Sequence, residues 1–291
     1  MGQSLKEIKG RLDSVRKTRK ITNAMYLLSA ARLRKDLSSA DFRTEYTDKL
    51  RLAVANVLSS PEAEKLHSPF LKENPGMPAL YLVVTGDKGL CGSYNSDVVK
   101  AAKAAAAEKE ALTGIKPLVY GFGKAAAECM RRIELPADKM LEGSASHPEP
   151  GVAAGVADEL FRAYEEKKAG EAYIVCSPYA KGGGKPECIR FLPLDEKLFA
   201  EVPVKPEKTD FEPDITSVFH AVVKAYCSGT VYSLLVLSSL SEHSARSEAM
   251  REATDNADEM AQKLESDMNA LRQLGITNEI TEIAAAAKAR K

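Results

Sequence analysis

The stretch ARSEAMREATDNADEMAQKLESDMNAL, residues 245–271, decides how this chain folds. Alanine recurs in it at every fourth position, and several larger apolar residues lie on the same side of the expected helix. These residues are Ala245, Ala249, Ala253, Ala257 and Ala261, flanked by Met250, Met260, Leu264, Met268 and Leu271. A row of small side chains lets a second helix approach closely, while charged residues occupy the outer positions. The stretch therefore predicts an amphipathic helix whose apolar stripe is covered by another long helix.

The helical pattern extends in both directions, over residues 214–291. No proline follows Pro213, and only Gly229 and Gly275 weaken the helical propensity. At the rise of an α-helix, such a segment would span roughly 110 Å. A helix this long exceeds what a globular domain needs, so we expect it to form one half of a helix pair.

The other half of the pair is predicted at the start of the chain. Apolar residues recur at helical spacing from Leu5 onward, and Ser60 and Pro61 end the pattern, which predicts a helix over residues 4–58. Residues 1–35 carry ten basic side chains against two acidic ones, whereas residues 241–282 carry ten acidic side chains against four basic ones. Opposite charges at the two ends favour an antiparallel pairing. The open alternative is that both charged faces are only solvated.

The pattern of apolar residues changes in the middle of the chain. Short apolar runs at 80–84, 116–122, 172–177 and 187–192 predict strands, the last two as a hairpin, and helical segments are expected at 95–112, up to 133, and at 161–168. The predicted fold class is α/β: two long terminal helices form an antiparallel coiled coil with an inserted Rossmann-like α/β domain. The expected parts are residues 1–58, 79–195 and 214–291.

Two glycine-rich turns follow predicted strands and are candidates for phosphate binding. TGDKGLCGSYN, residues 85–95, lacks the lysine and hydroxyl pair of a P-loop, and GFGKAAAE, residues 121–128, has no acidic strand end at the required spacing. Tight strand-to-helix turns explain both better. His67, His147, His220 and His243 lie far apart and are expected in surface or capping roles, and five cysteines occur without a CxxC pair. We therefore expect no catalytic residue, no cofactor and no metal site.

Two further partner classes are disfavoured. The basic N-terminal cluster lacks the interleaved aromatic residues that would favour nucleic acid, and an acidic protein partner or the acidic C-terminal helix explains it better. The longest apolar run, residues 231–240, is too short to span a bilayer and contains serines. The sequence therefore predicts no nucleic-acid binding and no direct membrane insertion.

Three segments in order along the chain carry a family resemblance. They are SLKEIKGRLDSVRKTRKITNAMYLLSAARLRK at 4–35, VVTGDKGLCGSYN at 83–95, and SEHSARSEAMREATDNA with ALRQLGITNEITEI at 241–257 and 270–283. Together they resemble the gamma subunit, the central stalk, of the rotary ATP synthase. Residues 134–213 would not identify that family by themselves.

The resemblance implies a central rotor shaft that transmits ion-driven rotation to the catalytic subunits and catalyses no chemistry itself. It implies three alpha and three beta subunits around the coiled coil, with the epsilon subunit and a membrane ring of c subunits near the α/β domain. It also implies a peripheral location on the cytoplasmic face of the bacterial cell membrane. ATP chemistry would belong to the beta subunits.

The resemblance also assigns partner contacts residue by residue. A contact with a beta-subunit loop falls on Arg272 and Gln273, where a guanidinium fork suits an acidic loop. A second contact falls on Lys100 and Lys103, in the helix after the GLCG turn. In the N-terminal helix, the most distinctive positions include Lys20 and Met25.

Two alternatives from other classes stay open at this point. One is a nucleotide-binding Rossmann-like enzyme with a helical oligomerisation arm, which would use Gly121 and Gly123. The other is a coiled-coil chaperone or tether, which would have no use for an acid-facing Arg272. Nucleotide titration of the isolated chain separates the enzyme from the two non-catalytic readings.

Overall fold

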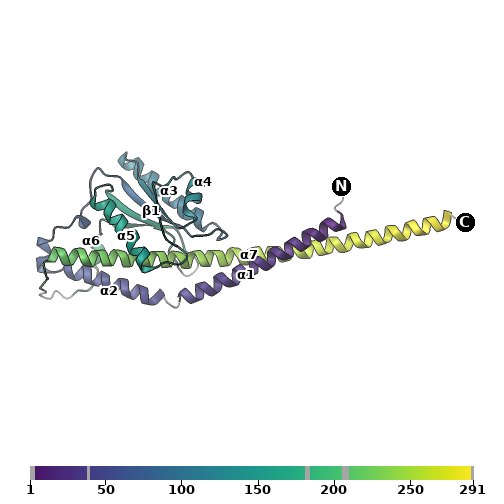
Figure 1. The fold of residues 1–291 in the computed structure, drawn as a ribbon, viewed down its shortest axis with the longest axis horizontal. Helices are drawn as coiled ribbons and strands as arrows, with labels where there is room; N and C mark the ends of the chain where they lie inside the picture. The colour runs from purple at the N-terminus through teal and green to yellow at the C-terminus, as the bar shows by residue number, and fades with distance from the viewer. Residues whose placement is uncertain (1–3, 38–39, 181–183, 205–209, 290–291) are drawn as a thin grey trace. The chain divides into compact units, whose positions relative to one another are not determined.

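The computed structural model describes residues 4–37, 40–180, 184–204 and 210–289 (Figure 1). The chain divides into two compact units. The first, the coiled-coil unit, contains residues 1–30 and 246–291. The second, the α/β unit, contains residues 31–245.

A five-stranded sheet organises the α/β unit. Its order is β3-β2-β1-β4-β5, in which β1 pairs in parallel with β2 and β4, β2 pairs in parallel with β3, and β5 is antiparallel to β4. The strands are β1 Ala79–Val84, β2 Leu118–Phe122, β3 Lys139–Leu141, β4 Glu171–Cys176 and β5 Glu187–Leu192. All residues of β1 are buried, which explains why its sequence is a continuous apolar run: a central parallel strand is covered on both faces.

Each face of the sheet has its own core. One core joins alternate strand residues such as Tyr81 and Val83 to α3 (Tyr94–Thr113) and α4 (Ala126–Arg132). The other joins Leu80, Leu82 and Val84 to α5 (Pro150–Glu165), to α2 (Ala40–Leu58) and to the first half of α7 (Ile215–Ala289). Alternation along β1 thus assigns neighbouring side chains to opposite layers.

The first half of α7 is a core helix of the α/β unit. Phe219, Val223, Val231 and Leu235 are all at most 1% exposed and belong to the larger core. By length and composition alone, this helix contains a window apolar enough to cross a membrane. Part of that window, including these side chains, is buried in the core that also contains residues of the sheet, α2 and α5. Gly229 lets α2 approach closely, since a Cβ there would lie 3.1 Å from the Cδ1 of Leu50.

In the coiled-coil unit, α1 (Leu5–Leu37) packs antiparallel to α7. The register is fixed by cross-helix contacts: Arg16 pairs with Glu265 at 2.5 Å, Arg19 with Asp258, and the Thr254 hydroxyl lies 2.8 Å from that of Thr22. As the α1 residue number rises, that of its α7 partner falls. The antiparallel arrangement predicted from the opposite charges is therefore confirmed.

The seam of this pair is narrower than the alanine row suggested. Ile8 and Leu12 pack with Ala261 and Leu264, and Val15, Met268 and Leu271 lie at its margin. Ala257 and Ala261 are buried, whereas Ala245, Ala249 and Ala253 are only half-buried. Met260, predicted on the apolar side, is 52% exposed. The first turn of α1 is closed by reciprocal bonds between Ser4 and Glu7, a capping box.

Several sequence-based boundaries were wrong. No strand was predicted between residues 133 and 161, but the three-residue edge strand β3 lies there, and α5 begins at Pro150, well before the predicted 161. A short helix α6, Glu196–Ala200, was missed. The predicted single helix over 4–58 is described as α1 and α2, and residues 38 and 39 between them lie outside the described residues. His243 is 1% exposed and not a surface residue.

Candidate functional site

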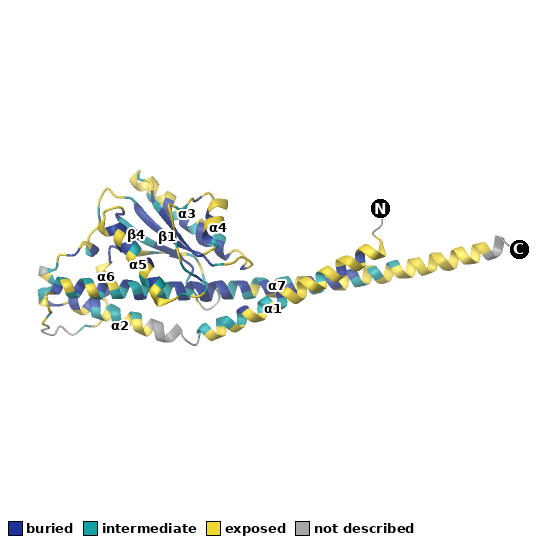
Figure 2. Cartoon of the chain, viewed as in Figure 1, coloured by how far each residue is buried: buried dark blue, intermediate teal, exposed yellow. Residues whose placement is uncertain are grey.

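The predicted beta-contact residues lie in the coiled-coil unit, at the end of α7. Leu271 is the last α7 residue that packs against the α1 seam, and Arg272 and Gln273 follow it as exposed residues. Beyond them, large apolar side chains are also exposed: Leu274, Ile276, Ile280 and Ile283. The last turns of the described α7 therefore present a basic residue, an amide and apolar side chains that nothing in this unit covers (Figure 2).

Lys100 and Lys103 lie on α3 in the α/β unit. The Lys103 ammonium group donates to the Ile133 carbonyl at 2.8 Å and lies 3.6 Å from the Glu134 carboxylate, so it ties α3 to the end of α4. Lys100 is exposed, with its Nζ 3.9 Å from Asp97. Of the two, Lys100 is the one whose charge is available to a partner without breaking a hydrogen bond.

Lys20 and Met25 lie on α1 in the coiled-coil unit. Lys20 is exposed and Met25 is half-buried. Between them, Thr22 is buried and bonded to Thr254. The distinctive N-terminal run thus combines seam residues with residues that a partner can reach.

The first glycine-rich turn is closed on itself. The Gly86 N–H donates to the Asn95 side chain at 2.8 Å, and the Asn95 amide donates to the Lys88 carbonyl at 3.2 Å. Gly123, at φ +98°, lies so close to β1 that a Cβ there would be 2.3 Å from the Thr85 carbonyl oxygen. These glycines serve close packing of neighbouring strand ends, as a tight turn requires.

Asp87 draws three strand-end loops together. Its carboxylate accepts bonds from the backbone of Lys124 (3.2 Å), Ala145 (3.1 Å) and Ser146 (3.0 Å), and from the Ser144 hydroxyl (2.6 Å). Burial acts to raise the pKa of this carboxyl, but the four hydrogen bonds outweigh burial and hold the pKa below its ordinary value of 3.8. The loops after β1, β2 and β3 are thereby fixed to one another.

One segment of α7, residues 237–242, contacts the first residue of α3 and the loops that follow β3 and β4. The Tyr179 N–H donates to the Leu237 carbonyl at 3.1 Å, and the Tyr94 hydroxyl donates to the Ser238 carbonyl at 3.0 Å. The contacts continue along the segment, where the Ser239 hydroxyl donates to the Ser146 carbonyl (3.3 Å), the Ser241 and Ser177 hydroxyls lie 3.4 Å apart, and the Ser146 hydroxyl donates to Glu242 (3.0 Å). We call this set the polar junction.

The polar junction was not anticipated from the sequence, although two of its parts were quoted for their resemblance. VVTGDKGLCGSYN contributes Gly86 and Tyr94, and SEHSARSEAM contributes Ser241 and Glu242. A signal was present: Ser238, Ser239, Ser241 and Glu242 interrupt the most apolar part of the helix, and all are at most 5% exposed. Buried polar side chains in a core helix require partners, and only the fold shows that strand-end loops supply them for Ser239, Ser241 and Glu242.

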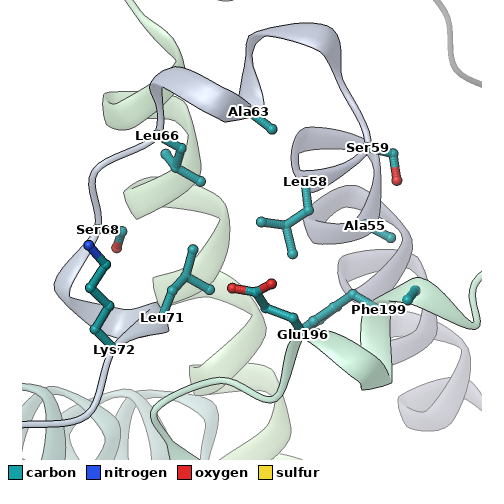
Figure 3. Close-up of a pocket in the computed structure, with 11 residues that line it drawn as sticks. Ala55, Leu58, Ser59, Ala63, Leu66, Ser68, Leu71, Lys72, Glu196 and Phe199 are labelled. Carbon is teal, nitrogen blue, oxygen red and sulfur yellow. The ribbon is translucent and has the colours of Figure 1, made fainter.

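A pocket of about 370 Å³ lies elsewhere in the α/β unit, between the end of α2, the two short 3-10 helices Pro61–Lys65 and Pro69–Leu71, and α6 (Figure 3). Leu58, Leu66, Leu71 and Phe199 form apolar walls, and the Glu196 carboxylate points between Leu71 and Leu58. None of the predicted contact residues lines this pocket. In the described part of the chain, no cluster of three or more His, Cys, Asp or Glu is placed to hold a metal ion.

The fold defines a class of protein that combines an α/β domain with a pair of long helices. The family model described as ATP synthase matches residues 4–289. The ATP synthase gamma chain of Caldanaerobacter subterraneus subsp. tengcongensis is 32% identical over 292 residues, covering 96% of this chain and 97% of the relative. The gamma chain of Paracidovorax citrulli is also 32% identical, over 286 residues, and covers 98% of both chains.

The solved structures agree on the fold. A chain of the Euglena gracilis mitochondrial ATP synthase, in rotational state 3, matches with a TM-score of 0.67 at 15% identity and covers 98% of this chain. A chain of the Tetrahymena thermophila mitochondrial ATP synthase, from its central stalk and c-ring, matches with a TM-score of 0.59 at 20% identity and covers 80%.

The chain belongs to the ATP synthase gamma family. It is therefore a central stalk subunit, the rotor shaft of the synthase, and not its catalytic subunit. This membership decides against the nucleotide-binding enzyme and the separate chaperone or tether.

Proposed function

We propose that this chain turns inside a ring of three alpha and three beta subunits and that Arg272 and Gln273 form its contact with a beta-subunit loop. The observation that carries the proposal is their position: they follow Leu271, where packing against α1 ends, and both are exposed. A guanidinium group there can pair with a carboxylate of a surrounding subunit without first leaving a partner among the described residues.

The remaining partner assignments are part of the same proposal. The α/β unit faces the epsilon subunit and the membrane ring of c subunits, and the complex lies on the cytoplasmic face of the bacterial cell membrane. Lys100 provides a further partner contact, and Lys103 joins it where the bond to Ile133 is exchanged for an intermolecular one. Lys20 and Met25 contribute contacts along α1. The functional parts are residues 1–58, 79–195 and 214–291.

An exposed ion pair contributes only about 0 to 1 kcal/mol, but a pair formed in one rotary state and broken in the next biases those states by its whole value. The contact can therefore influence turnover while contributing nothing to folding. Differential contacts between rotary states are what coupling means in energetic terms.

The test uses Arg272→Ala and Arg272→Lys in the reconstituted complex. We expect Arg272→Ala to slow ATP turnover while the isolated chain melts as the parent does, and Arg272→Lys to restore part of the rate, because the charge remains and the fork is lost. Lys263→Ala, which removes another exposed cation from α7, is the matched control and should leave turnover unchanged. Loss of stability with unchanged turnover would make Arg272 a structural residue and contradict the proposal.

A further inference from the structure

The edge of the sheet that normally takes a ligand is occupied by α7. In open α/β sheets the loops at the carboxyl ends of parallel strands converge, and ligands bind in the crevice between them. Here the loops after β1, β3 and β4 supply Gly86, Ser146, Ser177 and Tyr179 to that edge, and all four meet the 237–242 segment of α7. The α/β unit therefore uses its ligand-binding edge to hold its own long helix.

The contact at the centre of this edge is a carboxylate against a glycine. Glu242 is fully buried, and its Oε2 accepts the Ser146 hydroxyl at 3.0 Å. A Cβ on Gly86 would lie 2.4 Å from the Glu242 Oε1, so no larger residue fits while the carboxylate holds this position. A second close approach occurs at Gly184, where a Cβ would lie 2.2 Å from the Ser241 hydroxyl oxygen.

These contacts restrict the rotation of α7 about its axis because they are directional. Apolar packing tolerates small shifts of a helix, whereas hydrogen bonds and buried carboxylates require particular geometry. Neighbouring positions on an α-helix differ by about 100° around its axis, so turning α7 by one position would carry Glu242 away from Gly86 and Ser146. Buried polar groups elsewhere are known to select one register among several apolar ones.

We infer that the polar junction fixes the angular setting of α7 within the α/β unit, with Glu242 as the positioning residue and Gly86 as the space that admits it. The shaft then turns with the domain and does not slip against it. The mechanical part of this inference rests on the proposed function, whereas the angular lock itself is a property of the chain alone.

The lock is tested first in the isolated chain, by amide hydrogen exchange at Tyr179. Its N–H donates to the α7 carbonyl of Leu237 and so reports whether α7 stays seated. Glu242→Ala and Gly86→Ala should each speed exchange at Tyr179 by about tenfold or more, the fold-change that follows from losing a hydrogen bond to a charged group. Glu242→Gln retains an acceptor for Ser146 and should change it less.

Matched controls separate the junction from general effects of substitution. Gly89→Ala adds a Cβ in the same turn that meets no atom within 4 Å, and Glu252→Gln removes an exposed carboxylate from the same helix. Both should leave Tyr179 exchange as in the parent. Unchanged exchange in Glu242→Ala and in Gly86→Ala would overturn the inference, whatever the function of the chain.

The mechanical consequence is tested in the assembled complex with the double variant Ser177→Cys and Ser241→Cys, whose hydroxyl positions lie 3.4 Å apart. Formation of the 177–241 disulfide is verified by peptide mass spectrometry, because Cys176 and Cys188 lie nearby in sequence. Glu242→Ala alone should lower the number of ions pumped per ATP hydrolysed. In a chain that combines Glu242→Ala with the two cysteines, the disulfide should restore that number until a reductant is added.

Two outcomes in the complex would contradict the lock. One is normal coupling in Glu242→Ala. The other is loss of coupling when the disulfide is formed in an otherwise unaltered chain, since that would show that α7 must move against the sheet. If the unaltered chain fails to support pumping at all while Tyr179 exchange responds as expected, the proposed assembly with the catalytic ring fails and the angular lock stands.

Discussion

The two parts of α7 differ in how far their side chains are buried, although they belong to one helix. In the α/β unit, Phe219, Val223 and Leu235 are at most 1% exposed, because the sheet, α2 and α5 surround them. In the coiled-coil unit only a narrow seam is buried, and the residues after Leu271 are exposed (Figure 2). The two parts of the helix are therefore stabilised in different ways. The first part is packed into the core of the α/β unit, and the second part is packed along one side only, against α1.

We expect the largest loss of stability when a core side chain in the first part of α7 is truncated. Phe219→Ala should lower the free energy of unfolding by about 3 to 5 kcal/mol, because it leaves a cavity in a closely packed core. Denaturant titration of the isolated chain measures this. Leu274→Ala, at a 58% exposed position of the same helix, should stay within about 0.5 kcal/mol of the parent. Equal costs at the two sites would remove the contrast between the two parts of α7.

The coiled-coil part should respond to extra volume at the seam. Ala257→Leu should cost about 1 to 3 kcal/mol through overpacking, since Ala257 is 8% exposed. Ala253→Leu should cost less, because Ala253 is only half-buried. Thermal unfolding of each variant, monitored by amide hydrogen exchange within residues 246–271, measures the cost of both substitutions. If Ala253→Leu is the more damaging variant, the seam runs along the half-buried alanines instead.

The strand-end loops offer a pH test within the anchored unit. Asp87→Asn should lower stability at neutral pH by about 1 to 2 kcal/mol, because an amide has one acceptor oxygen where the carboxylate accepted four bonds with two. The folded pKa of Asp87 lies below its unfolded value, so the contribution is present above pH 3.8 and is lost as the pH falls through the folded pKa.

Acid titrations of the two proteins should therefore converge in that range. Asp158→Asn, at an exposed position of α5, is the control and should follow the parent at every pH. A parent-to-variant difference that persists unchanged below the folded pKa would show that Asp87 does not act through its charge.

The smallest expected effect is at the buried threonine pair of the coiled-coil unit. Thr22→Val removes one partner of a 2.8 Å bond, but the Thr254 hydroxyl also lies 2.7 Å from the Met250 carbonyl, so the cost should be only about 1 kcal/mol. The double variant with Thr254→Val should cost no more than the single one, because both partners of the bond are then replaced by apolar groups of nearly the same shape. Chemical denaturation of the three proteins decides this, and a double variant markedly worse than the single one would contradict it.

The sequence by itself determined the long helices, their antiparallel pairing and the α/β class of the insert. These follow from local signals: an alanine row at helical spacing, opposite charges at the two ends, and short apolar runs between glycine turns. The assignment of Arg272 and Gln273 as contact residues came from the family resemblance and not from the apolar pattern, which continues past Leu271 with Leu274, Ile276 and Ile280. Local periodicity is readable because it depends on neighbours a few residues apart.

Only the tertiary structure decided what the polar residues of the core do. Edge strand β3 has only three residues, too few to show the alternation of apolar and polar side chains that indicates a strand. It is recognised only by its pairing with β2. Glu242 and Gly86 are 156 positions apart, and neither residue type in its own surroundings signals the other. Their contact exists because parallel strands bring their carboxyl ends to one edge and α7 crosses that edge, which is a consequence of topology and not of any local pattern.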